Sequence, residues 1–183
     1  MLTGKKIVLG VSGGIAAYKM ANVASMLSKL HADIHVVMTE NATHFITPET
    51  FEVLTGNHCY TDTFDRCMEL HVPHIALGTQ ADAILIAPAS ADVVGKIANG
   101  IADDMLTTCV LPATCPVMLA PSMNVHMYEN PIVQDNMKRL ASYGYEIIEA
   151  DEGYLACRDI GKGKLPPEHV LVDYIIRACA MDK

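Results

Sequence analysis

The chain has 183 residues, 51% of them hydrophobic, which is enough to bury a core on both faces of a sheet and suits a single domain over 1–183. Lys and Arg number 13 against 21 Asp and Glu, a formal net charge of −8, and no basic run is present, so nucleic acid is an unsuitable partner. No apolar run reaches the length that crosses a bilayer and no secretory signal pattern is visible, so we expect a cytoplasmic protein without membrane contacts.

The cysteine pattern argues against a disulfide framework or a metal knuckle, because no Cys-x-x-Cys pair occurs. The six cysteines are Cys59, Cys67, Cys109, Cys115, Cys157 and Cys179. Cys67, His71 and His74 come nearest to a zinc site, but a fourth ligand at a suitable spacing is missing. We therefore expect no metal, and small buried thiols at most cysteine positions.

Short apolar runs alternate with longer amphipathic runs, which is the pattern of a parallel α/β sheet. Strands are expected at 6–11, 33–38, 83–87, 117–120 and 145–149. Helices are expected at 15–30, from 48 to Gly56, from His74, at 91–99, from 103 or 104 to 111, from 131 to before Gly144, and from Pro167. The sequence predicts a doubly wound, mostly parallel sheet of five or six strands, Rossmann-like or flavodoxin-like, with ligands beyond the carboxyl ends of the strands.

Three strand ends carry groups that could hold an anion. Residues 10–14, Gly-Val-Ser-Gly-Gly, join the first strand to a helix N-terminus, where free N–H groups and the helix dipole favour negative charge. This turn is neither Gly-x-Gly-x-x-Gly nor a Walker motif, and alone it is as often a structural corner. Residues 39–41, Thr-Glu-Asn, and Ser90 follow two further strands. The three turns could converge on a phosphate-bearing ligand, which the pattern does not name.

Individual side chains with catalytic potential each have a plain structural alternative. His74 begins a helix just before the strand at 83–87, so it could act as a base near the ligand edge, although most histidines are structural. Asn124, after the strand at 117–120, offers an amide but could simply cap a turn. Cys157 lies among basic residues in the stretch 150–166, which lacks periodicity, and long loops of this kind are usually functional or disordered.

Two motifs resemble the family of homo-oligomeric flavin-containing cysteine decarboxylases, and the resemblance extends from Val8 to about Pro166. Residues 88–92, Pro-Ala-Ser-Ala-Asp, are similar to the family's Pro-Ala-Ser-Ala-Asn-Thr, and residues 121–128, Pro-Ser-Met-Asn-Val-His-Met-Tyr, to its Pro-x-Met-Asn-x-x-Met-Trp. Residues 156–164, Ala-Cys-Arg-Asp-Ile-Gly-Lys-Gly-Lys, resemble the Ala-Cys-Gly-Asp-x-Gly-x-Gly flap of the phosphopantothenoylcysteine decarboxylases within it.

The resemblance implies a bound FMN and a set of site residues. It implies FMN contacts from Gly13, Gly14, Ile15, Thr39, Glu40, Asn41, Ser90, Ala91, Asp92, Val93 and Ser122. It further implies His74 as the catalytic base, Asn124 as the anchor for the substrate carboxylate and Cys157 as the acid. The chain departs from the family pattern at Asp92, Val93 and Tyr128, where the family has Asn, Thr and Trp.

The implied activity is that of a carboxy-lyase: FMN-dependent decarboxylation of 4′-phosphopantothenoylcysteine to 4′-phosphopantetheine in coenzyme A biosynthesis. The family resemblance also implies a homotrimer or a multiple of trimers, with 96–108 as a contact segment, and leaves open a separate phosphopantothenate–cysteine ligase as a partner. The alternatives are a peptidyl-cysteine decarboxylase of the lantibiotic type and a non-catalytic flavoprotein regulator. A flavin prenyltransferase is less suitable because its Arg-Glu-Thr-Pro-Leu motifs are missing.

Overall fold

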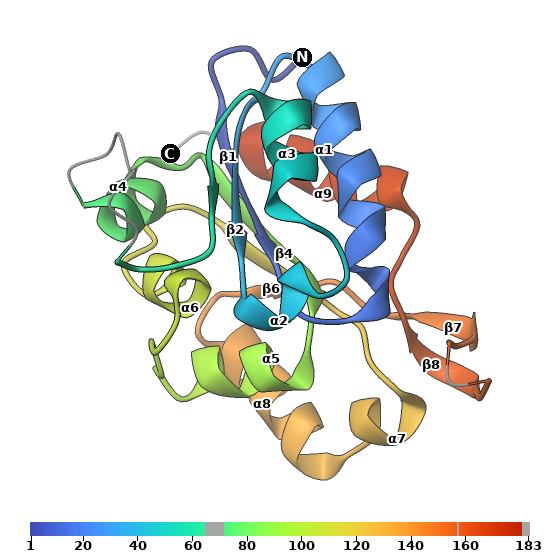
Figure 1. Ribbon diagram of the computed structural model, residues 1–183. Helices are drawn as coiled ribbons and strands as arrows, with labels where there is room; N and C mark the ends of the chain where they lie inside the picture. The colour runs from blue at the N-terminus through green and yellow to red at the C-terminus, as the bar shows by residue number, and fades with distance from the viewer. Residues whose placement is uncertain (65–71, 157, 181–183) are drawn as a thin grey trace.

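A six-stranded parallel sheet forms the centre of the computed structural model, which describes residues 1–64, 72–156 and 158–180 (Figure 1). The strand order is β3-β2-β1-β4-β5-β6. The bounds are β1 (Lys6–Val11), β2 (Asp33–Met38), β3 (Cys59–Tyr60), β4 (Ala83–Ala89), β5 (Val117–Pro121) and β6 (Glu146–Ile147). Every neighbouring pair in this sheet is parallel, so the predicted doubly wound α/β fold is confirmed.

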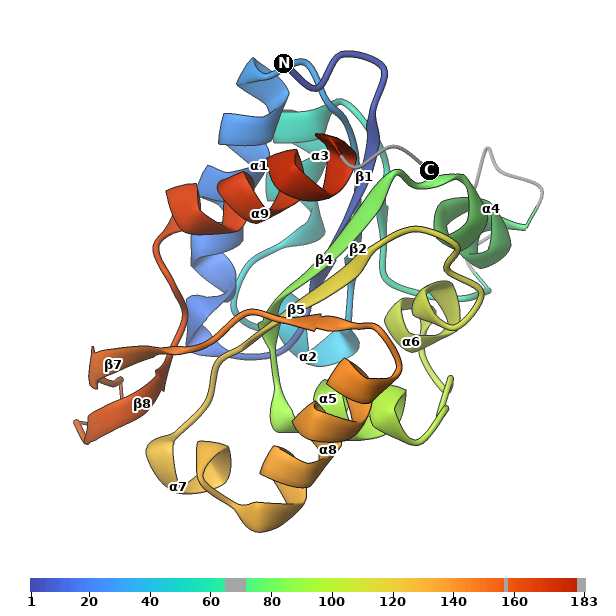
Figure 2. The same ribbon diagram turned by 180° about the vertical axis from the view of Figure 1, so that it is seen from behind.

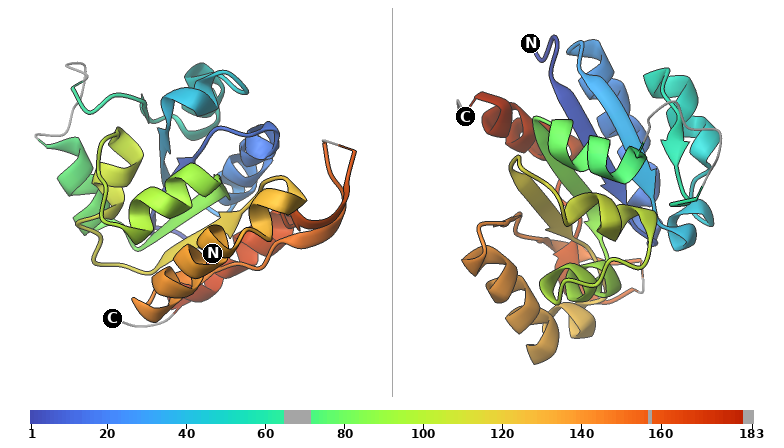
Figure 3. Two further views of the ribbon diagram at one scale, coloured as in Figure 1. Left: turned by 90° about the horizontal axis from the view of Figure 1, so that it is seen from below. Right: turned by 90° about the vertical axis from the view of Figure 1, so that its left-hand side faces the viewer.

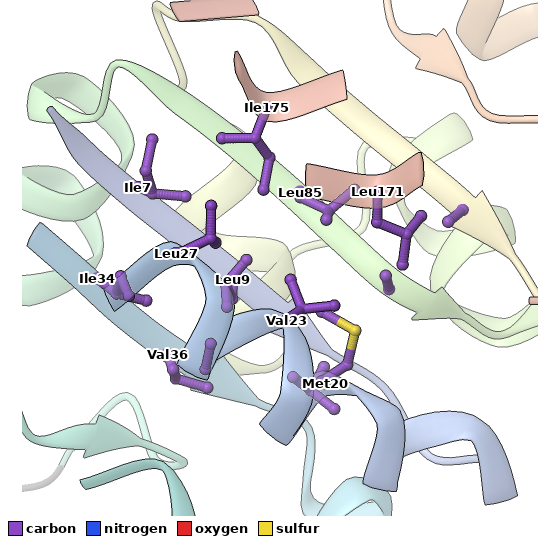
Figure 4. Packing of buried hydrophobic residues seen from close by; sticks show 14 of the residues in the cluster. Ile7, Leu9, Met20, Val23, Leu27, Ile34, Val36, Leu85, Leu171 and Ile175 are labelled. Atoms are coloured by element: carbon purple, nitrogen blue, oxygen red, sulfur yellow. The ribbon is translucent and has the colours of Figure 1, made fainter. Parts of the chain in front are cut away.

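The central strands are apolar over nearly their whole length because helices cover both faces of the sheet. Every residue of β4 is buried, as expected for an inner strand of a parallel sheet. Side chains alternate along β1, so that Ile7 and Leu9 face one layer of helices and Val8 faces the other. Figure 4 shows the first of these layers, with Leu9 level with Leu85 of β4.

One helix layer contains α1 (Lys19–Lys29), α3 (Pro48–Thr55) and α9 (Glu168–Ala180), and the other contains α4 (Pro73–Gln80), α5 (Ala91–Ala98), α6 (Met105–Val110) and α8 (Pro131–Ser142). Figures 1 to 3 show the two layers on opposite sides of the sheet. The apolar face of α1, with Met20, Val23 and Leu27, is buried against the sheet. No helix in the described part of the chain is both long and apolar enough to span a membrane.

The stretch 150–166 differs from the expected irregular loop. It contains a two-stranded antiparallel hairpin of β7 (Asp151–Tyr154) and β8 (Ile160–Lys164), which projects from one end of the sheet (Figures 1 and 2). Glycines hide the period of two in the sequence, since Gly153, Gly161 and Gly163 carry no side chain to mark a face. Short helices also occur at η1 (Ile15–Tyr18), α2 (Glu40–Thr43) and α7 (Val125–Tyr128), so the helix expected at 15–30 begins as a 3₁₀ turn.

A buried serine connects the ends of the two central strands. Ser12, directly after β1, is fully buried, and its Oγ donates to the carbonyl oxygen of Pro88 at 2.7 Å. The same Oγ accepts from the backbone N–H of Ser90 at 2.8 Å, where β4 ends. The hydroxyl group therefore connects the turns after β1 and β4, together with the backbone N–H of Ser12, which donates to the Pro88 carbonyl at 3.3 Å.

We expect Ser12→Ala to lower the free energy of unfolding by about 1–3 kcal/mol, because the N–H of Ser90 would lose its buried acceptor. Urea denaturation measures the change. Ser142→Ala is the matched control, since Oγ of Ser142 is exposed and donates only to Arg139 of its own helix, and its effect should stay within about 0.5 kcal/mol. Equal effects of the two substitutions would show that the Ser12 hydroxyl does not connect the strand ends energetically.

Candidate functional site

A cavity of about 620 Å³ lies beyond the carboxyl ends of β1, β4 and β5. Its wall is built from the turn before η1, the ends of β4 and β5, the start of α7 and the β7–β8 hairpin. The lining residues are Gly13, Gly14, Ile15, Ala16, Tyr18, Lys19, Pro88, Ser90, Ala91, Ser122, Met123, Asn124, Met127, Tyr154, Leu155, Ala156, Gly163, Lys164 and Leu165. This position is the one that the parallel sheet predicts for a ligand.

The turn at Gly13 and Gly14 brings backbone to the cavity at close range. A Cβ at position 13 would lie 2.5 Å from Cβ of Asn41, so the turn packs against the start of α2 and only glycine fits there. A Cβ at position 14 would meet nothing within 4 Å. The first N–H groups of η1, which runs directly into α1, have no acceptor within the helix and are placed to hold an anion.

Two serines mark the ends of the neighbouring strands. Ser90 caps α5, with its Oγ accepting from the N–H of Val93 at 3.3 Å. Ser122 follows β5, and its N–H donates to the carbonyl of Ala89 at 3.1 Å. These bonds, together with the Ser12 hydroxyl, hold the three strand ends in one framework around the cavity.

The residues expected to hold the cofactor divide into two groups. Those that line the cavity are Gly13, Gly14, Ile15, Ser90, Ala91 and Ser122. Those that do not are Thr39, Glu40, Asn41, Asp92 and Val93. Each of three in the second group has another role in the fold: Thr39 caps α2, Asp92 pairs with Lys96 at 3.3 Å, and the side chain of Val93 is buried in the core. Their direct contact with a cofactor stays a prediction.

Asn124 already holds a carboxylate. Its Oδ1 accepts from the N–H of His126 at 2.9 Å and so caps α7, while its Nδ2 donates to Oδ2 of Asp159 at 2.9 Å. Asp159 stands between β7 and β8, so this bond connects the hairpin to the end of β5. Sequence reasoning did not select Asp159, although it lies within the motif at 156–164.

His74 is not brought to this cavity within one chain. It is the second residue of α4, a helix that leads into the amino end of β4, and Figures 1 and 2 show α4 far from the hairpin. Its side chain is half-buried, and its Nδ1 is buried with no hydrogen-bond partner among the described residues. Cys157, the predicted acid, lies outside the described residues.

Sequence reasoning also missed much of the cavity wall. The hairpin contributes Tyr154, Leu155 and Lys164, η1 contributes Tyr18, and α1 contributes Lys19. No signal in a single sequence shows that the hairpin folds over the strand ends, because its contacts join residues far apart in the chain. The position of Lys19, one turn after the glycines, could have suggested a second anion-binding group.

The thiols of Cys59 and Cys109 are unsuited to chemistry. Burial raises the pKa of each to about 12, and the nearby Glu52 adds to the effect at Cys59. Both are buried side chains of the core. In the described parts of the chain no group of three or more His, Cys, Asp or Glu residues is placed to hold a metal ion.

A model of the flavoprotein family matches residues 1–180, and the chain belongs to that family. It is 49% identical over 172 residues to the coenzyme A biosynthesis bifunctional protein CoaBC of Bacillus subtilis, covering 93% of this chain and 42% of the relative. It is 42% identical over 173 residues to a Streptococcus mutans protein named a probable phosphopantothenoylcysteine decarboxylase, covering 93% and 97%. The chain thus spans less than half of the Bacillus protein and nearly all of the Streptococcus one.

Two solved structures are similar over almost their whole length. The FMN-dependent cysteine decarboxylase SpaF is 35% identical, with a TM-score of 0.84 and coverage of 98% of this chain and 100% of SpaF. A PPC decarboxylase, solved as a cysteine-to-serine mutant complexed with pantothenoylaminoethenethiol, is 28% identical, with a TM-score of 0.85 and coverage of 94% and 97%. In its fold, this chain is therefore similar to both of these cysteine decarboxylases.

The residues around the cavity fit a flavin. Ile15, Met127 and Tyr154 provide apolar and aromatic wall for a flat ring system. The N–H groups at the start of η1 suit a phosphate, and Ser90 and Ser122 add polar groups at the strand ends. The family supports a flavin cofactor for this chain, and the cavity with its donors is a place in the described structure that fits one.

Two neighbouring substitutions separate folding from flavin binding. We expect Gly13→Ala to lower the free energy of unfolding of the flavin-free protein by about 1–3 kcal/mol, because its Cβ would lie 2.5 Å from Asn41. Gly14→Ala should change it by no more than about 0.5 kcal/mol but should weaken flavin binding, because its Cβ enters the open cavity. Denaturation of flavin-free protein and flavin titration measure the two effects. A stable Gly13→Ala protein would contradict the packing described for this turn.

Proposed function

We propose that this chain is a decarboxylase that uses FMN to convert 4′-phosphopantothenoylcysteine to 4′-phosphopantetheine in coenzyme A biosynthesis, acting in the cytoplasm. The observation that carries the proposal is the Asn124 amide, which lines a flavin cavity and donates to a carboxylate at 2.9 Å. The names of the relatives from Bacillus and Streptococcus and of the PPC decarboxylase structure support the choice of substrate.

The chemistry requires an electron sink, since direct loss of carbon dioxide from an α-amido carboxylate would leave an unstabilised carbanion. When bound, FMN supplies the two-electron oxidation of the substrate's CH₂–SH group to a thioaldehyde and later the return of hydride. Asn124 donates a hydrogen bond to the substrate carboxylate and orients it, while His74 accepts the thiol proton. Loss of carbon dioxide then places the electron pair in an enethiolate, and Cys157 donates the proton that completes the saturated product.

The role of Cys157 rests on the motif at 156–164. The PPC decarboxylase structure with the related enethiol was obtained with a cysteine-to-serine mutant, which supports a cysteine that acts after decarboxylation. A model cysteine has a pKa of about 8.5 and can donate a proton near neutral pH, whereas a serine hydroxyl is far too weak an acid.

The decisive experiment is to add FMN and phosphopantothenoylcysteine to the purified protein and to follow carbon dioxide and phosphopantetheine by mass spectrometry. We expect a yellow protein that releases both products. A peptide with a C-terminal cysteine serves as the competing substrate, because SpaF shares this fold and is named a cysteine decarboxylase. Turnover of the peptide alone would indicate the lantibiotic-type alternative, and bound flavin without turnover of either compound would indicate a non-catalytic regulator.

The Asn124–Asp159 pair allows a test of the carboxylate anchor. We expect Asn124→Asp to abolish turnover while FMN stays bound, because a carboxylate at 124 repels the substrate carboxylate. It would also face Asp159, so the control is the exchanged pair Asn124→Asp with Asp159→Asn, which retains an amide-to-carboxylate bond at this position. The exchanged protein should unfold like the wild type yet stay inactive. Restored turnover would show that Asn124 only supports the hairpin.

We also propose that the protein acts as a homotrimer or a multiple of trimers, in which His74 of one copy reaches the cavity of a neighbouring copy. The proposal accounts for the absence of His74 from the cavity lining of a single described chain. Residues 96–108, expected as a contact segment, contain the start of α6 and its Asp104 cap, where Lys96 pairs with Asp92, Asp103 and Asp104. We keep a separate phosphopantothenate–cysteine ligase as a proposed partner, because the chain covers only 42% of the relative that is named bifunctional.

Mixing two inactive variants tests the shared site. His74→Asn should lose the base, which contributes about 10²–10⁴-fold to the rate, and Asn124→Asp should lose the anchor. When the two are co-expressed and assemble together, about a quarter of the sites should combine an intact His74 with an intact Asn124 from different copies. Turnover should therefore return in the mixture. Activity that stays at the level of the single variants would show that His74 does not complete a neighbouring site.

A further inference from the structure

The cavity carries positive charge although the chain as a whole has a formal net charge of −8. Its charged lining residues in the described structure are Lys19 and Lys164, and no Asp or Glu lines it. Neither lysine makes a hydrogen bond or ion pair with any described residue. Most other lysines do, and these are Lys5, Lys6, Lys96, Lys138 and Lys162. Two uncompensated ammonium groups at one cavity favour a ligand with more than one anionic group.

The two lysines belong to different elements of the cavity wall. Lys19 is the first residue of α1 and directly follows η1, so it belongs to the helix start that suits the flavin phosphate. Lys164 is the last residue of β8, on the hairpin. A flavin phosphate and a second anion can therefore each meet a lysine from a different element.

The side chain of Lys164 points to the face of the hairpin that is turned away from α7, the helix that Asn124 caps. The carbonyl of Gly163 accepts from the N–H of Met123 at 3.0 Å, and a Cβ at position 163 would point at the Met123 carbonyl. Because successive side chains of a strand point to opposite faces, that of Lys164 points away from α7. Its Nζ lies 3.7 Å from the Cβ position of Gly153 on β7, and Asp151, opposite in register, makes no ion pair with it in the described structure.

The substrate of the proposed function has an anion at each end, a carboxylate on the cysteine and a phosphate on the pantothenoyl arm. Asn124 suits the carboxylate, and a cation at the far end would favour the phosphate there, for which lysine is a common partner. We propose that Lys164 binds the phosphate of the substrate and so selects phosphopantothenoylcysteine over its dephosphorylated form. This inference rests on the proposed function and adds a specificity-determining residue to it.

Lys162 provides a matched control two residues away on the same strand. Its ammonium group is hydrogen-bonded to Glu149, which raises the pKa of Lys162, and it does not line the cavity of the described structure. Removal of its charge should leave ligand binding unchanged. The two lysines thus differ in whether their charge is already compensated by the protein.

The test compares phosphopantetheine with pantetheine, measured by calorimetry on the FMN-loaded protein. Lys164→Gln should weaken phosphopantetheine about tenfold to a hundredfold and leave pantetheine unchanged. Lys164→Arg should retain most of the preference, and Lys162→Gln should behave as the wild type. The preference of the wild type should shrink as salt is raised, because the exposed charge pair is screened.

Three outcomes overturn the assignment. The first is a wild-type protein that binds both compounds equally, and the second is an equal loss in Lys162→Gln. The third is a Lys164→Gln protein that binds FMN less tightly than the wild type but binds riboflavin equally well and keeps its preference for phosphopantetheine. That pattern would show that Lys164 binds the flavin phosphate instead of the substrate phosphate. Carbon dioxide release by the wild type is measured in parallel. Release without a phosphate preference overturns only the role of Lys164, whereas no release overturns the proposed function itself.

Discussion

The site depends on one buried hydroxyl group. Oγ of Ser12 donates to the Pro88 carbonyl and accepts from the N–H of Ser90, so the ends of β1 and β4 cannot move independently. The N–H of Ser122 donates to Ala89 and attaches the end of β5 to the same framework. Parallel strands end at a common edge, but their turns are held in place only when such bonds satisfy their buried polar groups. These contacts hold in place the strand ends that form one part of the cavity wall.

The β7–β8 hairpin forms another part of the cavity wall. It is attached at Asn124, the residue proposed to bind the substrate carboxylate. Glycines make this attachment close, since a side chain at 161 would lie 2.7 Å from Val125 and one at 163 would meet the Met123 carbonyl. The Asn124–Asp159 bond adds a polar contact at the same place. A substrate carboxylate bound at Asn124, as proposed, would approach the carboxylate of Asp159 and would repel it.

In the described chain, the groups proposed to bind ligands lie apart from His74, the proposed base. One cavity gathers the turns that end β1, β4 and β5, the Asn124 amide and two lysines that have no partner among the described residues. His74 stands instead on α4, which leads into the amino end of β4. The buried Nδ1 of His74, without a partner among the described residues, is the kind of group that a neighbouring copy can satisfy. A shared site would make assembly a condition of catalysis, which is why mixed variants are the informative experiment.

The amino-acid sequence was enough to predict the sheet, because apolar runs such as 83–87 suit strands that are covered on both faces. It also selected Gly13, Ser90, Ser122 and Asn124, through turns and motifs that are local in the chain. Three placements became known from the folded structure: Asp159 bonds to Asn124, Lys164 lines the cavity, and His74 does not line it within the described chain. Those placements depend on contacts between residues far apart in the chain. Glycines on β7 and β8 also interrupt the alternation of apolar and polar side chains from which a strand is predicted. The hairpin was therefore not predicted, and its packing against α7 is a finding of the structure.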